Sequence, residues 1–253
     1  MLSLTPTKLR DFLTCPQLYK RRHVDRVYGD MNPAPLAFGR SLHAALEEFH
    51  KGNGDSTATD PNRLLRRHWE AGAYADERES EAHFVKGLDA LRQYLDSSPA
   101  LTEQILGTEV FMARVVNVRG LQIRLGCKAD RVSLSADGAL EITDYKTNAS
   151  GRLPTRESLL DDLPTFLYHV LARISYPQYD RVKVTFLNLL TLARVSVAYD
   201  AGRVATNKQA LLAHIRTFAS GAFEPRPGEA CAWCPVQEQC PIFSQEVDFD
   251  GLT

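Results

Sequence analysis

Residues 140–148 read LEITDYKTN, a short alternating stretch that ends in an acid and a lysine. In a strand, side chains two positions apart share one face, so Asp144 and Lys146 are expected side by side after two apolar anchors. Asp130, in GCKADRVSL (126–134), ends a second apolar stretch, and a turn at 136–138 would make the two strands antiparallel. Two carboxylates and one ammonium group are therefore expected to converge.

The segments around this stretch predict a mixed α/β domain. Alternation of period two predicts strands over 110–118, 121–134 and 140–146 as a meander, and again over 182–190 and 195–198. Helical spacing predicts helices over 5–23 with a break near Cys15, 38–50, 63–97 with a break near Gly72, 164–174 and 208–218. A polar loop is expected over 52–62, and an acidic tail runs over 246–250.

Composition narrows the classes of protein and of partner. With 253 residues, 44% of them hydrophobic, the chain can form one domain with a substantial core. Thirty basic and 31 acidic residues give a net charge of -1, so binding of a polyanion must be local or metal-assisted. No apolar run approaches the roughly 20 residues that cross a bilayer, and no signal core follows the N-terminus. We expect a cytoplasmic protein with no membrane partner.

The cysteines are spaced as metal ligands. Cys231, Cys234 and Cys240 form a C-x2-C-x5-C cluster, and Cys15 is a distant fourth thiol. In a reducing compartment such a set is more plausibly a metal site than a pair of disulfides. Four thiolates suit either Zn²⁺ or an iron-sulfur cluster, and spacing does not choose between them. Cys127 lies outside the pattern and is expected to be a small buried side chain.

The carboxylates and the lysine suit phosphodiester hydrolysis. That reaction needs a hard cation to polarise the phosphoryl oxygen and acidify a water, and two carboxylates suit Mg²⁺ or Mn²⁺. Lys146 would position the water and offset charge in the transition state. The structural alternative is that Asp130 pairs with a surface cation and Asp144 ends a strand, since such short patterns arise by chance.

Four segments, in order, resemble the PD-(D/E)XK superfamily, in particular the nuclease domains of RecB and AddB and the CRISPR-adaptation exonucleases. The resemblance runs from Leu4 to Pro241. FGRSLHAALEEFH (38–50) resembles the helix that carries a metal-ligating histidine, here His43. GCKADRVSL resembles the G-x-x-D-R strand with Asp130, although the family glycine falls on Cys127. LEITDYKTN resembles the I-x-D-Y-K-T strand. LPTFLYHVLAR (163–173) resembles the Q-L-x-x-Y helix with Tyr168, although Pro164 replaces the glutamine.

The resemblance implies a restriction-endonuclease-like central mixed sheet flanked by helices, in a single domain over 1–253. Within it, an N-terminal helical lobe would span about 38–104, a nuclease core about 105–220, and an iron-sulfur module would join Cys15 to 231–241. It implies that His43, Asp130 and Asp144 bind Mg²⁺ or Mn²⁺, that Lys146 assists the water, and that Tyr168 lies near a DNA phosphate. A [4Fe-4S] cluster would be held by Cys15, Cys231, Cys234 and Cys240.

We therefore expect a metal-dependent DNA exonuclease acting on single strands or ends in recombination, repair or CRISPR adaptation, with a helicase or CRISPR-adaptation partner. Two alternatives remain: a non-catalytic DNA-binding or scaffolding subunit, and a zinc-stabilised interaction protein with no role on DNA. Glu109 either supports the site or is a surface acid. Basic clusters at 20–23 and 63–68 either line a DNA channel or are solvated helix faces.

Overall fold

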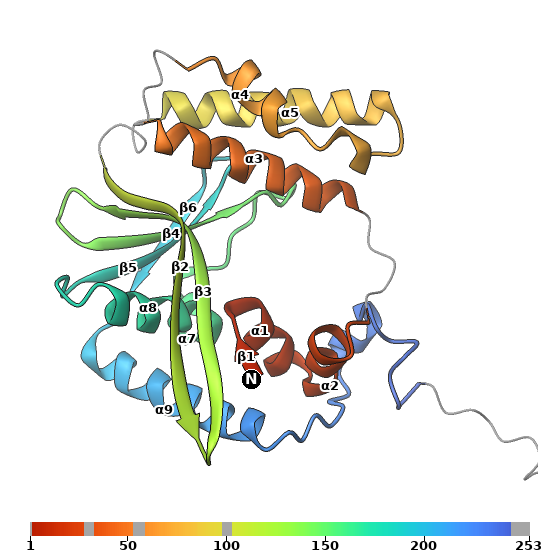
Figure 1. Cartoon of the computed structure of the whole chain (residues 1–253), viewed down its shortest axis with the longest axis vertical. Coiled ribbons are helices and arrows are strands. Elements are labelled where there is room, and N and C mark those ends of the chain that lie inside the picture. Colours follow the sequence, from red (N-terminus) through yellow and green to blue (C-terminus); the bar gives the residue numbers. More distant parts are fainter. Residues whose placement is uncertain (1, 28–32, 53–58, 98–102, 244–253) are drawn as a thin grey trace, which may run out of the picture.

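The computed structural model describes residues 2–27, 33–52, 59–97 and 103–243. In this part of the chain, a six-stranded mixed sheet is flanked by helices (Figure 1), which confirms the predicted mixed α/β class. The strands are β1 (Leu2–Leu4), β2 (Gln104–Val118), β3 (Leu121–Leu134), β4 (Leu140–Lys146), β5 (Val182–Asn188) and β6 (Arg194–Ala198). The acidic tail at 246–250 and residues 53–58 of the polar loop lie outside the described residues.

The strand order is β1-β3-β4-β5-β6, with β2 on the other edge of β3. Strands β2, β3 and β4 form the predicted antiparallel meander, and β5 pairs antiparallel with β6. Strand β5 is parallel to β4, which requires the helical crossover between them. Strand β3 pairs with β1 over 123–125 and with β4 over 131–134, so it changes partner next to Asp130.

The helices follow the predicted order with shifted ends. They are α1 (Pro6–Thr14), α2 (Pro16–Tyr19), the π-helical turn η1 (Lys20–Val24), α3 (Pro33–Lys51), α4 (Pro61–His68), α5 (Glu77–Asp96), α7 (Arg156–Asp161), α8 (Leu163–Ser175) and α9 (Ala201–Ala219). The breaks predicted near Cys15 and Gly72 are confirmed. Strand β1 and helix α7 were not predicted, and α9 begins at Ala201 because the Asp200 side chain accepts from the Arg203 backbone N–H. No helix among the described residues could span a membrane.

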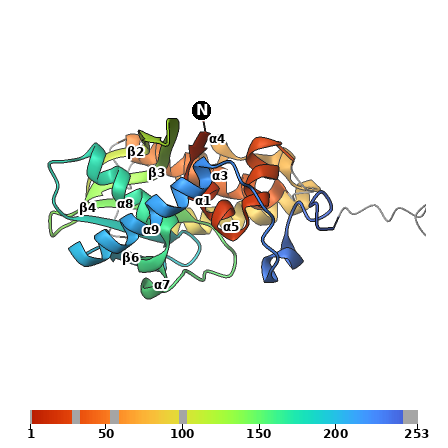
Figure 2. The same cartoon turned by 90° about the horizontal axis from the view of Figure 1, so that it is seen from below.

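Two apolar clusters hold the helices to the sheet. Side chains of α1, α8 and α9 pack with Val132, Ile142 and Val184 in the first cluster. Side chains of α3, α4 and α5 pack with Tyr145, Leu187 and Leu189 in the second. Figures 1 and 2 show these two groups of helices on different sides of the sheet. Ile142 and Tyr145 of β4 therefore pack against different groups of helices, on the two sides of the sheet. The division into a lobe, a nuclease core and a cysteine module stays a prediction.

The C-terminal segment lies against the N-terminal helices, as both views show (Figures 1 and 2). The Arg226 backbone N–H donates to the Cys15 sulfur at 3.3 Å, and the Arg226 guanidinium donates to the Leu13 carbonyl. Residues more than 200 positions apart thus meet beside Cys15.

Candidate active site

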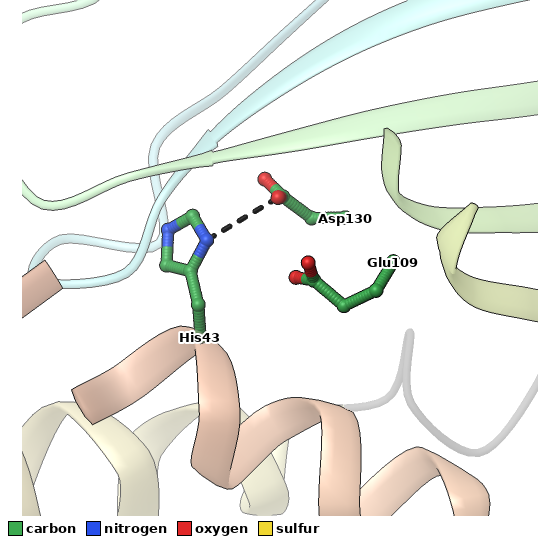
Figure 3. Close-up of side chains that lie close together, drawn as sticks. All are labelled: His43, Glu109 and Asp130. Carbon is green, nitrogen blue, oxygen red and sulfur yellow. Dashed lines mark ion pairs between the residues drawn. The ribbon is translucent and has the colours of Figure 1, made fainter. Parts of the chain in front are cut away.

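Three side chains from three elements converge where α3 crosses the sheet (Figure 3). His43 comes from α3, Glu109 from β2 and Asp130 from β3, and each offers a ligand atom within 4.8 Å of the others. The His43 Nδ1 lies 3.2 Å from the Asp130 Oδ1. Strand register explains the second contact, because the pairs 108–131 and 110–129 place Glu109 opposite Asp130. One imidazole and two carboxylates therefore face a common point.

Local backbone geometry exposes these acids at the sheet. The β3–β4 ladder ends at the pair Arg131–Thr143, and beyond it the Asp130 Oδ2 accepts from the Tyr145 backbone N–H. Asp130 thus sits where the two strands separate. Glu109 has a φ of +52°, a left-handed conformation that costs a non-glycine residue about 1 kcal/mol or more. Its carboxylate forms an ion pair with Lys128.

Asp144 and Lys146 lie side by side, as the alternation of β4 predicted. Asp144 is one register step beyond the last β3–β4 pair, next to Asp130, and it is only 9% exposed. Its Oδ1 accepts from the Tyr168 hydroxyl at 2.8 Å. Its Oδ2 ion-pairs with Lys146 but, among the described residues, receives no directed hydrogen bond.

The electrostatics of the site reflect burial and crowded negative charge. Burial raises the pKa of Asp144, and Lys146 offsets only part of that shift. Burial opposes the protonated form of His43, yet the hydrogen bond and charge of Asp130 raise its pKa. Burial, followed by the charge of Asp144, raises the pKa of Tyr168 and brings that of Cys127 to about 12. Cys127 is therefore an inert buried thiol.

A buried network of polar side chains lies next to this site, on the side of the sheet where the second apolar cluster packs. The Tyr145 hydroxyl lies 2.9 Å from that of Tyr94, and His50 lies 2.8 Å from the same Tyr94 oxygen. Arg131, 1% exposed, donates to Tyr94 at 3.1 Å and pairs with Glu103 at 3.0 Å. Burial opposes the charge of Arg131, but the surrounding tyrosines and carboxylates keep its pKa above the usual value. Because Arg131 follows Asp130 and Tyr145 follows Asp144, the network holds both strands that carry the candidate acids.

Two open clefts meet at the site and share Pro35 and Thr147. The first, of about 460 Å³, is lined by His43, Glu109, Asp130 and Lys128. The second, of about 410 Å³, is lined by Lys146, Lys86 and His83. Glu109 and Asp130 therefore face one cleft and the catalytic lysine candidate the other, whereas Asp144 lines neither.

The comparison with known families bears on this arrangement. A family model described as "PD-(D/E)XK nuclease superfamily" matches residues 3–241. The chain belongs to this superfamily. Membership supports a phosphodiester hydrolase, and the superfamily predicted from the four motifs is confirmed.

Solved structures place this superfamily member among similar folds. A "Putative exonuclease" from Eubacterium rectale is 12% identical, with a TM-score of 0.52, and the alignment covers 92% of this chain and 86% of that one. The crystal structure of SSO0001 is 14% identical, with a TM-score of 0.38, and the alignment covers 92% and 96% of the two chains. At 12% identity, the likeness to the Eubacterium rectale protein concerns the fold alone. No curated protein matches the sequence.

The structure adds contacts of Tyr168 and Glu109 that the motifs alone did not give for this superfamily member. The Tyr168 hydroxyl, expected near a DNA phosphate, donates to Asp144, and the residue is 7% exposed. Glu109, left open between a surface acid and a site residue, belongs to the cluster with His43. Asp144 is not in that cluster. The pairing register of Glu109 could not be predicted from the sequence, because β2 begins at Gln104, six residues before the predicted strand.

The four cysteines of the predicted module line one apolar pocket in this superfamily member. Cys15 faces Cys231, Cys234 and Cys240 there. Burial raises the pKa of Cys234, and the other three thiols add to the shift through their charges. Among the described residues, no three of these sulfurs come within the 4.8 Å spacing that groups His43 with its acids.

Local acids pair with most side chains of the two basic clusters, each of these acids with two of them. In the first, Arg22 and His23 pair with Asp11, and Lys20 and Arg21 pair with Asp25. In the second, Arg67 and His68 pair with Glu48. This pairing favours solvated helix faces over a DNA channel.

Proposed function

We propose that this protein is a divalent-metal-dependent DNA nuclease that degrades single strands or DNA ends as an exonuclease. The observation that carries the proposal is the convergence of His43, Glu109 and Asp130, with Asp144 one register step beyond the last β3–β4 pair and Lys146 ion-paired to it. The motif resemblance to RecB-like and AddB-like nucleases supports a role in recombination, repair or CRISPR adaptation beside a helicase or adaptation partner.

The ligand set fits a hard cation. Carboxylate oxygens suit Mg²⁺ and Mn²⁺, and an imidazole beside them is better tolerated by Mn²⁺. His43, Glu109 and Asp130 would hold the ion, and the Oδ2 of Asp144, which receives no directed hydrogen bond among the described residues, would extend the set. When bound, the cation polarises the phosphoryl oxygen and acidifies the attacking water. Lys128 would then release Glu109, its present ion-pair partner.

The remaining site residues position the reacting groups. The Lys146 ammonium lies beside Asp144 and 5.3 Å from the centre of the Phe186 ring, which fixes its direction. From there it orients the water and offsets charge that develops on the phosphate. Tyr168 holds the Asp144 carboxylate through the 2.8 Å hydrogen bond, and the Tyr145 backbone N–H holds Asp130. Asp144 and Asp130 are thus each held by a hydrogen-bond donor before any cation binds.

We also propose that Cys15, Cys231, Cys234 and Cys240 hold a [4Fe-4S] cluster. The four thiols line one apolar pocket. Four thiolates suit zinc or an iron-sulfur cluster, and the resemblance of the one-plus-three cysteine arrangement to AddB-like and CRISPR-adaptation nucleases favours the cluster. The cluster would tie α1 to the C-terminal segment and supply stability rather than chemistry.

The test is degradation of end-labelled single-stranded DNA in Mn²⁺, in Mg²⁺ and in EDTA. Asp144→Asn and Lys146→Met should each lower the rate by about 100-fold or more, because each removes a group that acts in the transition state. The matched controls are Asp89→Asn and Lys208→Met, exposed residues of α5 and α9 that lie outside both clefts. These controls should keep the wild-type rate.

The outcomes separate the alternatives. Equal rates for wild type and all four variants would reject the site. Binding of DNA without degradation in either metal would favour the non-catalytic subunit. Circularised single strands that are cut as fast as linear ones would overturn the exonuclease assignment.

A further inference from the structure

The long β2–β3 hairpin extends away from α3 and the candidate active site (Figure 1), and one of its faces is exposed. Its side chains alternate: Phe111, Val115, Arg124 and Lys128 are exposed, whereas Met112 is buried in the first apolar layer. The outer face begins at Glu109, because the Glu109 carboxylate forms an ion pair with Lys128 of that face. It is therefore continuous with the carboxylate cluster.

The hairpin is strongly basic although the whole chain is not. Residues 110–129, VFMARVVNVRGLQIRLGCKA, contain Arg114, Arg119, Arg124 and Lys128 and no acid. The net charge of the chain is -1. Positive charge is thus concentrated on this element, where it favours a polyanion and disfavours pairing of two identical hairpins.

Phe111 forms a flat apolar surface within this basic face. A Cβ atom at Gly126 would lie 3.2 Å from Cζ of Phe111, so the ring lies across the glycine backbone. The guanidinium carbon of Arg124 lies 5.0 Å from the ring centre, in cation–π range. The residue is still 54% exposed. A half-exposed aromatic ring with Arg124 over it and Lys128 opposite it in the β2–β3 register is suited to stack on a base.

We propose that Phe111, with Arg124 and Lys128, is a stacking platform for single-stranded DNA that enters the active site. This inference rests on the proposed function and names how its substrate is bound. The Phe111 ring would stack on an unpaired base, and the two cations would contact the flanking phosphates. The platform selects single strands because the bases of a duplex already stack on one another.

Spacing along the strand supports this path. Two residues of an antiparallel strand span about 7 Å, which separates Phe111 from Glu109. Phosphates along one DNA strand are roughly 3.4 Å apart along the helix axis, and farther apart when the strand is extended. A base stacked on the ring thus lies one or two nucleotides from the carboxylates, and Lys128, which lines the first cleft, bridges the interval.

The test measures binding of a fluorescent 15-nucleotide single strand to the whole chain in EDTA, by anisotropy. Phe111→Ala should weaken binding by about 5- to 150-fold, the range for loss of one stacked base. Phe111→Trp should restore it. The matched control is Val85→Ala, equally exposed on α5, which should bind as wild type does. Phe111→Ala should leave binding of a blunt duplex unchanged, and Arg124→Met should reduce the salt slope by about 0.7.

A DNA strand with one abasic position, moved along the sequence, identifies the stacked base. At that position the losses from the abasic site and from Phe111→Ala should not add, because both remove the same contact. Losses that add at every position, or a change within twofold for Phe111→Ala, would overturn the platform. The platform would also be overturned if sedimentation showed that the wild type is a dimer and that Phe111→Ala is a monomer. If the wild type cleaves DNA but Phe111→Ala binds the single strand as tightly as the wild type, only the platform is refuted. If the stacking contact is found but no metal supports cleavage, only the nuclease proposal is refuted.

Discussion

Arg131→Met should cost this protein about 3 kcal/mol of unfolding free energy. The guanidinium is 1% exposed, pairs with Glu103 at 3.0 Å and donates to the Tyr94 hydroxyl at 3.1 Å. Methionine keeps much of the volume but leaves the Glu103 carboxylate, 8% exposed, without its nearest cation. The largest part of the loss in unfolding free energy comes from the buried charge that is left without a partner.

The magnitude follows from what remains around Glu103. Breaking a buried ion pair costs about 3 to 5 kcal/mol. Glu103 retains the Ser133 hydroxyl at 2.8 Å and Arg194 at 3.5 Å, which places the cost near the lower end. For a domain of this size, 3 kcal/mol corresponds to a fall in melting temperature of about 6 to 12 °C.

Urea unfolding followed by circular dichroism measures this cost. The matched control is Arg92→Met, because Arg92 pairs with Asp89 at 3.5 Å on the surface and is 53% exposed. An exposed pair is worth less than about 1 kcal/mol. Replacing both buried partners, as Arg131→Met with Glu103→Leu, should recover at least about 1 kcal/mol. The reasoning fails if Arg131→Met costs no more than Arg92→Met.

Three further predictions test other parts of the molecule. Tyr168→Phe should lower kcat by about tenfold or more and leave KM for DNA unchanged, because it frees Asp144; a raised KM with unchanged kcat would instead make Tyr168 a DNA contact. Burial lowers the pKa of His50 to about 3, so its stabilising effect is complete above pH 6.5 and is lost as pH falls from 6.5 toward 3. Between pH 7 and 5 the wild type should therefore lose about 2 kcal/mol more than His50→Gln in urea unfolding, and parallel losses would contradict this. Anaerobically purified protein should contain iron and absorb visible light, Cys234→Ser should lose both, and buried Cys127→Ser should keep them; a colourless zinc protein would exclude the cluster.

The meander and the acid–lysine pair could be predicted because they are local. Alternation in 121–134 and 140–146, with a turn between, fixes two antiparallel strands without any distant contact. Asp144 and Lys146 are two residues apart on one such strand, so their proximity follows from strand geometry alone. The helix breaks near Cys15 and Gly72 could likewise be predicted from the residues next to them.

The features that sequence missed depend on distant pairing. Strand β1 has only three residues and exists through its parallel pairing with 123–125 of β3. Glu109, which the sequence left open between a site residue and a surface acid, joins the cluster through the β2–β3 register. The Tyr168 bond to Asp144 depends on how α8 packs under β4. Such contacts are set by tertiary packing, which residue patterns do not encode.

The claim that His43, Glu109 and Asp130 gather one divalent cation is tested most directly by Mn²⁺ titration followed by electron paramagnetic resonance. Wild type should bind one Mn²⁺ at this site. Glu109→Gln and Asp130→Asn should each weaken that binding by about tenfold or more, because each removes an anionic ligand, and Asp89→Asn should not. Equal affinity for Mn²⁺ in wild type, Glu109→Gln and Asp130→Asn would contradict the account.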